Sequence, residues 1–334
     1  MELEELGERL IPFSRAMYDD PQAEVEGVHR MPGHAGFSYG FTVRSRGREE
    51  SWYLRLPPPK VRWKGTADVL RQAAVLRALE GTRVPHCTLK WSGDDLRWFE
   101  RPYFVVPKLE GEVVGIAGTG FVAELDAAIR QDMARQAMTA LAEIHGLDWQ
   151  AKVPELGPPI PFSEDVTRWD RFTDRVAEPE LLARAPELRE RLLGALPADA
   201  PVGLFHGDFQ WSNLFYSREG TLLAVIDWEL VGIGAILNDA GWIATFNDPA
   251  AWDHPGAVSG LMPGPEELLS IYADAYGAPL PDLGWFRALA AYKFAIITGF
   301  NLGLHRRGKR SDPVWEVMAP SMKSLVERAL ELLG

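Results

Sequence analysis

The spacing of apolar residues changes character along the chain, and each change predicts a different element. Residues 1–20 carry leucine and isoleucine at the spacing of one helix face, so we expect a short N-terminal helix. Residues 25–56 alternate apolar and polar positions and are punctuated by glycines, which predicts a β-hairpin with its turn near Ser45–Glu50. The prolines at 57–59 then end the second strand, because proline has no N–H to donate to a strand ladder.

Helical spacing returns over residues 66–80, where Thr66 is the expected N-cap. Two short strand-like runs follow, near His86–Trp91 and Tyr103–Val106. The part of the chain before residue 109 is therefore predicted to be rich in β-structure.

The pattern beyond residue 109 is mostly helical. Phe121–His145 has the spacing of one long amphipathic helix, and helical spacing resumes from about Pro265 to Leu333. Residues 204–227 interrupt it as a β-rich insert. We therefore expect an α+β protein with a smaller β-rich domain at 1–108 and a larger helical domain at 109–334.

The composition suits a globular chain of about two domains and excludes several classes of function. With 334 residues and a net charge of −12, the chain is a poor candidate for general nucleic-acid binding. The acidity is compatible with a cationic small substrate, or it simply keeps the protein soluble. No apolar run approaches the roughly 20 residues that span a bilayer, and the acidic N-terminus lacks the pattern of a secretory signal. Cys87 is the only cysteine, so we expect no intrachain disulfide and a cytoplasmic location.

The segment 204–242 carries the strongest chemical signal. It places His206, Asp208 and Asn213 on one short loop, and it adds Asp227 at the end of the apolar run LLAVI. Phosphoryl transfer from Mg-ATP requires such a set, since one carboxylate must meet the attacking hydroxyl while an amide oxygen and a second carboxylate hold magnesium. Each residue alone also fits a structural role; Asp208, for example, follows a glycine and suits an Asx-turn.

The stretches FHGDFQWSNLF and VIDWE resemble the aminoglycoside phosphotransferase and choline kinase-like family. The resemblance implies a two-lobed protein kinase-like fold, with a nucleotide-binding lobe at 1–108 and a helical lobe at 109–334 that holds the catalytic loop and the acceptor site. It implies an ATP- and Mg²⁺-dependent small-molecule O-phosphotransferase, with Asp208 as the catalytic residue and Asn213 and Asp227 as metal ligands. GTP in place of ATP stays open.

Several nearby residues take supporting roles in this interpretation. His206 resembles the histidine that opens the family's catalytic loop, and we expect it to brace that loop. Asp239, in LNDAGW, matches an acidic position that ties the loop down. Glu229 is expected either to bind magnesium-bound water or to anchor its loop. Ala235 is a departure, because the family usually has Gly-Asp-Pro where this chain has Gly-Ala-Ile.

The stretch PGHAGFSYGFTV resembles the hairpin that covers the phosphates in this family, with Gly36 and Ser38 as candidate contacts. Arg55, in WYLRLPPP, takes the place of the lysine that contacts the phosphates. This resembles the subgroup of kinase-like domains fused to acyl-CoA dehydrogenases, and an arginine fork binds phosphate well. Gln72 stands where the subgroup has the partner glutamate; it can hydrogen-bond to Arg55 without neutralising it, or Asp68 can substitute.

The run YFVVPKLE resembles the segment that contacts adenine, with the backbone of Pro107 and Leu109 as candidate contacts. Proline has no N–H, so a donor to the base is expected from Leu109.

The acceptor side is less informative. His305, Arg306 and Arg307 lie in the basic run NLGLHRRGKR, which suits an anionic acceptor or simply a solvated helix C-terminus. The hydroxylated acceptor is an antibiotic, a choline-like alcohol or a hydroxyacyl thioester, and the oligomeric state is not predicted.

Two other classes of function compete with this interpretation. A non-catalytic nucleotide-binding protein would explain Gln72 and Ala235 as signs of decay. A metal-dependent hydrolase built on His206 and Asp208 would need more histidine or acidic ligands than this region offers.

Overall fold

The computed structural model describes residues 2–31, 37–254 and 256–334, and it divides into two compact units. The first unit contains Met1–Glu110 together with the returning segment Ile226–Val231. The second unit contains Gly111–Val225 and Gly232–Gly334. Each predicted domain, 1–108 and 109–334, is one continuous segment. In the structure, by contrast, the segment Ile226–Val231, which carries Asp227, belongs to the first unit.

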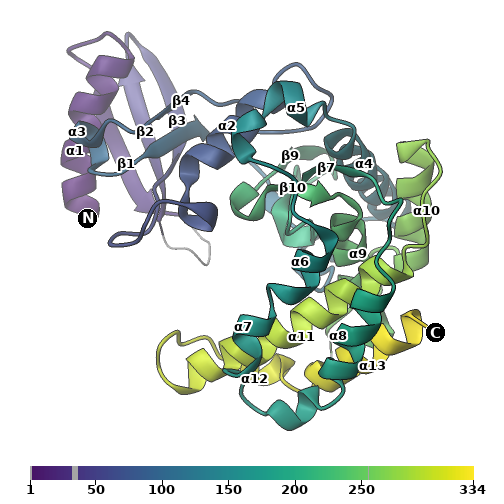
Figure 1. Ribbon diagram of the computed structural model, residues 1–334. Helices are drawn as coiled ribbons and strands as arrows, with labels where there is room; N and C mark the ends of the chain where they lie inside the picture. Colours follow the sequence, from purple (N-terminus) through teal and green to yellow (C-terminus); the bar gives the residue numbers. More distant parts are fainter. Residues whose placement is uncertain (1, 32–36, 255) are drawn as a thin grey trace. The chain divides into compact units, whose positions relative to one another are not determined.

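A five-stranded antiparallel sheet forms the centre of the first unit, in the order β1-β2-β3-β5-β4 (Figure 1). Helix α1 covers it with Leu6, Leu10 and Phe13, all fully buried in one core with the sheet. The elements are α1 (Leu3–Met17), β1 (Glu24–Arg30), β2 (Ser38–Ser45), β3 (Arg48–Arg55), η1 (Gly65–Ala67), α2 (Val69–Leu79), β4 (Trp91–Gly93), α3 (Leu96–Phe99), β5 (Tyr103–Pro107) and η6 (Trp228–Leu230).

The predicted hairpin is formed by β2 and β3, which pair without interruption from Ser38↔Arg55 to Ser45↔Arg48. Its turn has Arg46 and Gly47 at positive φ, 49° and 75°, as a tight two-residue hairpin turn requires. This register places Ser38 directly opposite Arg55, so two residues predicted on the nucleotide side are neighbours.

The N-cap of α2 is Asp68 rather than Thr66. The Asp68 side chain accepts a hydrogen bond from the Leu70 N–H at 3.0 Å, whereas Thr66 lies within the preceding 3-10 turn η1. The prediction of Thr66 was wrong because a short 3-10 turn places the first helical residue two positions later than the polar pattern indicates. With its carboxylate used as a cap, Asp68 makes no ion pair with Arg55.

Helices form most of the second unit, with two small antiparallel sheets, β10-β7 and β6-β8-β9. The helices are η2 (Phe121–Glu124), α4 (Ala127–His145), α5 (Trp149–Lys152), η3 (Pro154–Leu156), α6 (Phe162–Thr167), α7 (Asp170–Thr173), η4 (Pro179–Leu182), α8 (Ala185–Gly194), η5 (Trp211–Asn213), α9 (Leu237–Phe246), η7 (Pro249–Ala251), α10 (Pro265–Tyr276), α11 (Gly284–Arg306), α12 (Val314–Met318) and α13 (Ser321–Leu332). The strands are β6 (Glu112–Val113), β7 (Val202–Phe205), β8 (Leu214–Tyr216), β9 (Leu222–Val225) and β10 (Gly232–Ala235).

Helix α11 is the central helix of the second unit and packs against α9 and α13; Figure 1 also shows it beside α7 and α8. Every residue of α9 is buried, so this helix presents polar side chains to the interior rather than to water. The long helix expected over 121–145 is instead a 3-10 turn followed by α4, and the strand expected at 86–91 begins only at Trp91. Among the described residues, no helix is both long and apolar enough to cross a membrane.

Candidate active site

Asp208 lies on the loop between β7 and η5, where two side chains orient its carboxylate. The indole N–H of Trp242 donates to Oδ1 at 2.8 Å, and the amide of Asn213 donates to Oδ2 at 2.9 Å. Asn213 also donates to the Asp208 carbonyl at 2.8 Å. Each carboxylate oxygen accepts one of these bonds and keeps further lone pairs for an incoming hydroxyl. The arrangement suits a fixed carboxylate that orients a hydroxyl and receives its proton.

Asn213 is 6% exposed and sits at the end of η5. Its amide N–H₂ is used on Asp208, and in the described part of the chain its Oδ1 makes no hydrogen bond. A neutral oxygen without a partner is the kind of ligand that magnesium takes. The sequence placed Asn213 on this loop; the structure adds that the orientation of its amide is set by Asp208.

Asp239, on α9, fixes the backbone of the loop that carries Asp208. Its carboxylate accepts from the His206 N–H at 2.6 Å and from the Gly207 N–H at 2.8 Å. His145 contacts the same carboxylate at 3.3 Å, and Tyr272 contacts the other ring nitrogen of His145 at 2.7 Å. The hydrogen-bonded residues Tyr272, His145 and Asp239 thus connect the helices α10, α4 and α9 to the residues just before Asp208.

Burial determines the protonation of this network. It lowers the pKa of His145 below its usual value, so the ring is neutral, donating from Nε2 to Asp239 and accepting the Tyr272 O–H at Nδ1. Burial by itself would raise the pKa of Asp239, but the hydrogen bonds from His145 and His206 outweigh it and lower that pKa. Asp239 therefore stays an anion although only 1% of it is exposed.

His206 is fully buried, and its Nδ1 accepts from the Asp208 N–H at 3.2 Å. The ring therefore faces the backbone of the loop, which is the geometry of a brace. Ala235, at the departure from the family pattern, ends β10 opposite Val202, so a strand pair holds this turn.

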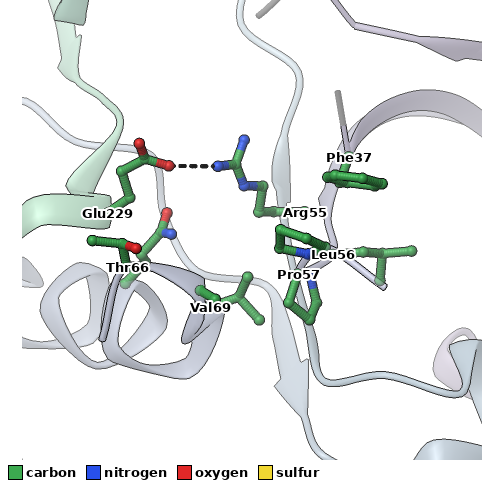
Figure 2. Close-up of a pocket in the computed structure, with 10 residues that line it drawn as sticks. Phe37, Arg55, Leu56, Pro57, Thr66, Val69 and Glu229 are labelled. Carbon is green, nitrogen blue, oxygen red and sulfur yellow. Dashed lines mark hydrogen bonds and ion pairs between the residues drawn. The ribbon is translucent and has the colours of Figure 1, made fainter. Parts of the chain in front are cut away.

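Arg55, predicted to contact the nucleotide, is anchored in the first unit by a serine and a carboxylate. It donates to Ser38 Oγ at 2.9 Å and to Glu229 Oε2 at 3.0 Å, and Figure 2 shows the latter pair at one side of a pocket. Burial opposes the charge of Arg55, but Tyr53, Asp227 and Glu229 outweigh it and raise its pKa. The Tyr53 hydroxyl lies 2.6 Å from Ser38 Oγ and completes the cluster.

The carboxylate partner of Arg55 therefore comes from Glu229 on the returning segment and not from helix α2. Gln72 is buried at 4% exposure in the same pocket, but its amide nitrogen has no hydrogen-bond partner among the described residues. Arg55 donates to Ser38 and Glu229, and no hydrogen bond from Arg55 to the Gln72 amide oxygen is found among the described residues. The sequence singled out Glu229 only as a residue that binds magnesium-bound water or anchors its loop. Its pairing with Arg55 joins residues 174 positions apart and was not predicted.

Asp227 has a left-handed backbone, with φ 61° and ψ 61°, directly before η6. This conformation is costly for a residue with a side chain and is concentrated at functional positions. The Asp227 side chain is exposed, and within the described ranges it forms no hydrogen bond or ion pair. It is therefore available to a cation.

Two other residues predicted to contact the nucleotide, Pro107 and Leu109, lie at the end of β5 and shortly after it. Pro107 ends β5 opposite Trp52, and the Leu109 N–H makes no hydrogen bond to the described residues, so it remains free to donate. Gly36 lies outside the described residues.

The basic run at the end of α11 is largely neutralised by neighbouring acids. Arg306 forms ion pairs with Glu316 and Glu178, each at 2.7 Å, and His305 Nδ1 accepts from the Asp312 N–H at 2.9 Å. These contacts give His305 and Arg306 structural partners and leave the exposed Arg307 as the remaining charge of the trio.

Sequence reasoning missed Trp242 as a partner of Asp208. Its position in α9 offered a signal, because Trp242 follows Asp239 by three residues and such pairs share one helix face. Because Asp239 was expected to tie down this loop, the spacing could have indicated that Trp242 faces the loop too.

Comparison with known proteins defines the class. Residues 35–289 match the family model described as "Phosphotransferase enzyme family". The chain belongs to this family of phosphotransferase enzymes.

Two relatives carry the name "Acyl-CoA dehydrogenase family member 11". The Gallus gallus protein is 31% identical over 59% of this chain and 27% of its own length. The Homo sapiens protein is 27% identical over 85% of this chain and 37% of its own length. The chain thus spans about a third of the length of these relatives.

Solved structures share the fold. A candidate aminoglycoside phosphotransferase from Ralstonia eutropha superposes with a TM-score of 0.76 at 20% identity, covering 97% of this chain and 98% of the other. The aminoglycoside phosphotransferase APH(4)-Ia, in a ternary complex with ADP and hygromycin B, gives 0.60 at 13% identity over 96% and 98%. The predicted α+β, kinase-like fold and the predicted family are confirmed.

Proposed function

We propose that this chain transfers the γ-phosphoryl group of Mg-ATP to the hydroxyl of a small acceptor. The observation that carries the proposal is the carboxylate of Asp208, fixed between the Trp242 N–H and the Asn213 amide on an anchored loop. A carboxylate held in this way positions a hydroxyl for in-line attack, and positioning supplies most of the catalysis in a loose phosphoryl-transfer reaction.

In the proposed step the acceptor oxygen bonds to the γ-phosphorus while the bond to the ADP oxygen breaks. The hydroxyl proton passes to Asp208, ADP leaves, and a phosphate monoester is formed. Asn213 and Asp227 would hold magnesium, which neutralises charge on the phosphates when it is bound. The free Asn213 Oδ1 and the exposed Asp227 carboxylate fit this ion, because magnesium needs few protein ligands besides phosphate and water.

The nucleotide is the second part of the proposal. Arg55 is fixed by Ser38 and Glu229, and its planar fork suits phosphate oxygens. The free Leu109 N–H suits the adenine ring. We propose ATP as the nucleotide because of the family resemblance. We also propose a cytoplasmic location, where Mg-ATP is available.

Arg55→Ala is expected to raise the KM for ATP at least about tenfold, because charge-assisted hydrogen bonds to phosphate contribute roughly 1.5–3 kcal/mol. The KM for the acceptor should change little. Steady-state kinetics with each substrate varied in turn measures both constants. The matched control is Arg97→Ala, an exposed arginine of α3 in the same unit, which should leave both constants unchanged. A larger effect on the acceptor than on ATP would remove Arg55 from the nucleotide site.

The whole proposal is tested by ADP formation. The purified chain is incubated with Mg-ATP and a panel of hydroxylated metabolites and antibiotics, and the products are examined by mass spectrometry for the added phosphoryl group. We expect one class of acceptor to be phosphorylated in a magnesium-dependent manner. Binding of ATP without magnesium, with no phosphorylated product from any acceptor, would favour a non-catalytic nucleotide-binding protein instead.

The hydrolase alternative has no support in the site. The described residues contain no group of three or more histidine, cysteine, aspartate or glutamate side chains placed to hold a metal ion. A hydrolytic metal centre requires such a set.

A further inference from the structure

Lys293 is a buried cation that forms no ion pair with the described residues, although the charges of Asp165, Asp239 and Asp208 favour its protonated form. It lies in the middle of α11, 7% exposed, and it makes no hydrogen bond or ion pair with the described residues. Its Nζ lies 5.1 Å from the ring centroid of Trp242 and 5.8 Å from that of Trp169. Two aromatic faces offset only part of the cost of removing an ammonium group from water.

The acids around Lys293 are already engaged elsewhere. Asp165 of α6 is fully buried, pairs with Arg168 at 3.2 Å, and accepts from the Asn238 amide at 2.8 Å. Asp239 is occupied by the catalytic loop, and Asp208 by Trp242 and Asn213. Burial, together with the charge of Arg168, lowers the pKa of Lys293 to about 8, which still leaves it mostly protonated at neutral pH.

Other donors next to Lys293 also have no partner. Trp169 Nε1 and Arg168 Nε are both buried and unbonded among the described residues. Both belong to the segment between α6 and α7, which packs beside α11 (Figure 1). Buried donors without a partner are rare in folded proteins and call for a ligand oxygen. Of the acceptors nearby, Asp165 Oδ1 forms the ion pair with Arg168, and Asn238 Oδ1 belongs to a side chain whose amide N–H₂ donates to Asp165 Oδ2.

The indole of Trp242 links this cluster to the carboxylate of Asp208. The indole of Trp242 receives Lys293 over its ring and donates its N–H to Asp208 Oδ1 at 2.8 Å. A molecule that offers a hydroxyl to Asp208 therefore has unpaired donors close to its other atoms.

We propose that Lys293 and Trp169 form an anion subsite of the acceptor pocket, and that the acceptor is a hydroxylated molecule with a carboxylate-class anionic group. This inference rests on the proposed function, since it takes Asp208 as the group that binds the reacting hydroxyl. The ammonium of Lys293 and the Trp169 N–H bind the oxygens of the anion, and the face of Trp242 bounds the connecting carbons. A polycationic acceptor is disfavoured, because it would bring a second positive charge against a buried ammonium.

Calorimetric titration tests the subsite without requiring turnover. The full chain, with magnesium and a non-hydrolysable ATP analogue, is titrated with hydroxybutyrate, hydroxyhexanoate and hydroxydecanoate, and with the primary amide of each. We expect at least one carboxylate to bind about ten- to a hundredfold more tightly than its amide, the range that a charged hydrogen bond gives. Lys293→Met should abolish this preference, and Lys293→Arg should retain part of it.

The control variant is Lys323→Met, which removes an exposed lysine of α13 and should leave the preference intact. Thermal unfolding separates binding from a structural role: Lys293→Met should unfold at the same or a higher temperature, since an apolar side chain replaces an unpaired buried charge. A lower unfolding temperature with an unchanged preference would mean that the cation only supports its two tryptophans, and it would overturn the subsite. Absence of binding by all three carboxylates would also overturn it.

ADP formation in parallel samples with ATP keeps the two proposals apart. Lys293-dependent binding without ADP formation would support the subsite and contradict the phosphotransferase proposal. Phosphorylation of the neutral amides, unaffected by Lys293→Met, would support the phosphotransferase and contradict the subsite.

Discussion

Asp208→Asn is expected to lower kcat by about a hundred- to ten-thousandfold, the range that a positioned acid–base group contributes. The substitution keeps the size of the side chain but removes its capacity to take a proton. It also turns an N–H₂ group toward either the Trp242 N–H or the Asn213 amide, both of which donate to this carboxylate. The hydroxyl would lose its orienting partner, and one of the two donors, the Trp242 N–H or the Asn213 amide, would lose its bond to the side chain of residue 208.

Steady-state kinetics and nucleotide binding together measure this effect. The affinity for Mg-ATP should change less than about threefold, since Asp208 is assigned to the acceptor hydroxyl and not to the metal. The control is Asp199→Asn, an exposed aspartate of the same unit, which should keep full activity. A variant of Asp208 that turns over at the wild-type rate would exclude it as the catalytic residue.

Asp239→Asn is expected to have the largest effect on stability, lowering the free energy of unfolding by about 3–5 kcal/mol. The carboxylate accepts three hydrogen bonds in a buried site, from the N–H groups of His206 and Gly207 and from His145. An amide replaces one of these oxygens with a donor, so at least one buried N–H loses its partner. Activity should fall as well, by roughly a hundredfold, because displacement of the loop by about 1 Å is enough for such a loss.

The stability that Asp239 contributes depends on pH in a defined direction. Its pKa is lowered in the folded protein, so the contribution is fully present above the unfolded value of about 3.9 and is lost as the pH falls through the folded value. Urea unfolding of the wild type and of Asp239→Asn at a series of pH values measures this. The difference between them should be constant near neutral pH and should shrink below about pH 4.

Asp274→Asn serves as the control, because this aspartate is exposed on α10. If Asp239→Asn unfolded at the same urea concentration as Asp274→Asn, the carboxylate would not anchor the loop. Retention of stability with loss of activity alone would likewise contradict the network described above.

The pattern of the sequence was sufficient for elements whose signal is local. The helix α1, the hairpin β2–β3 and the helices beyond Pro265 follow from apolar spacing and turn residues, because those signals act within a few residues. The loop with Asp208 and Asn213 was found for the same reason. The cap of α2 and the start of α4 were misplaced, since polar residues at several neighbouring positions satisfy the same capping pattern.

Contacts between residues far apart in the sequence could not be predicted from local sequence patterns. Glu229 replaces the expected acid of α2 as the partner of Arg55, and the missing glutamate at position 72 is thereby compensated. The unpaired charge of Lys293 is invisible in the sequence, where a lysine in a helix is ordinarily a solvated residue.

The sequence by itself predicted the reaction class, because the spacing of Asp208, Asn213 and Asp227 is the one that phosphoryl transfer from Mg-ATP requires. Only the tertiary structure decided how the loop with Asp208 and Asn213 is held, and the proposed anion subsite rests on it. Asp239 and Trp242 reach the loop from α9, and Lys293 reaches Trp242 from α11. Such contacts depend on how buried helices pack against one another, and packing brings together side chains whose separation along the chain carries no signal.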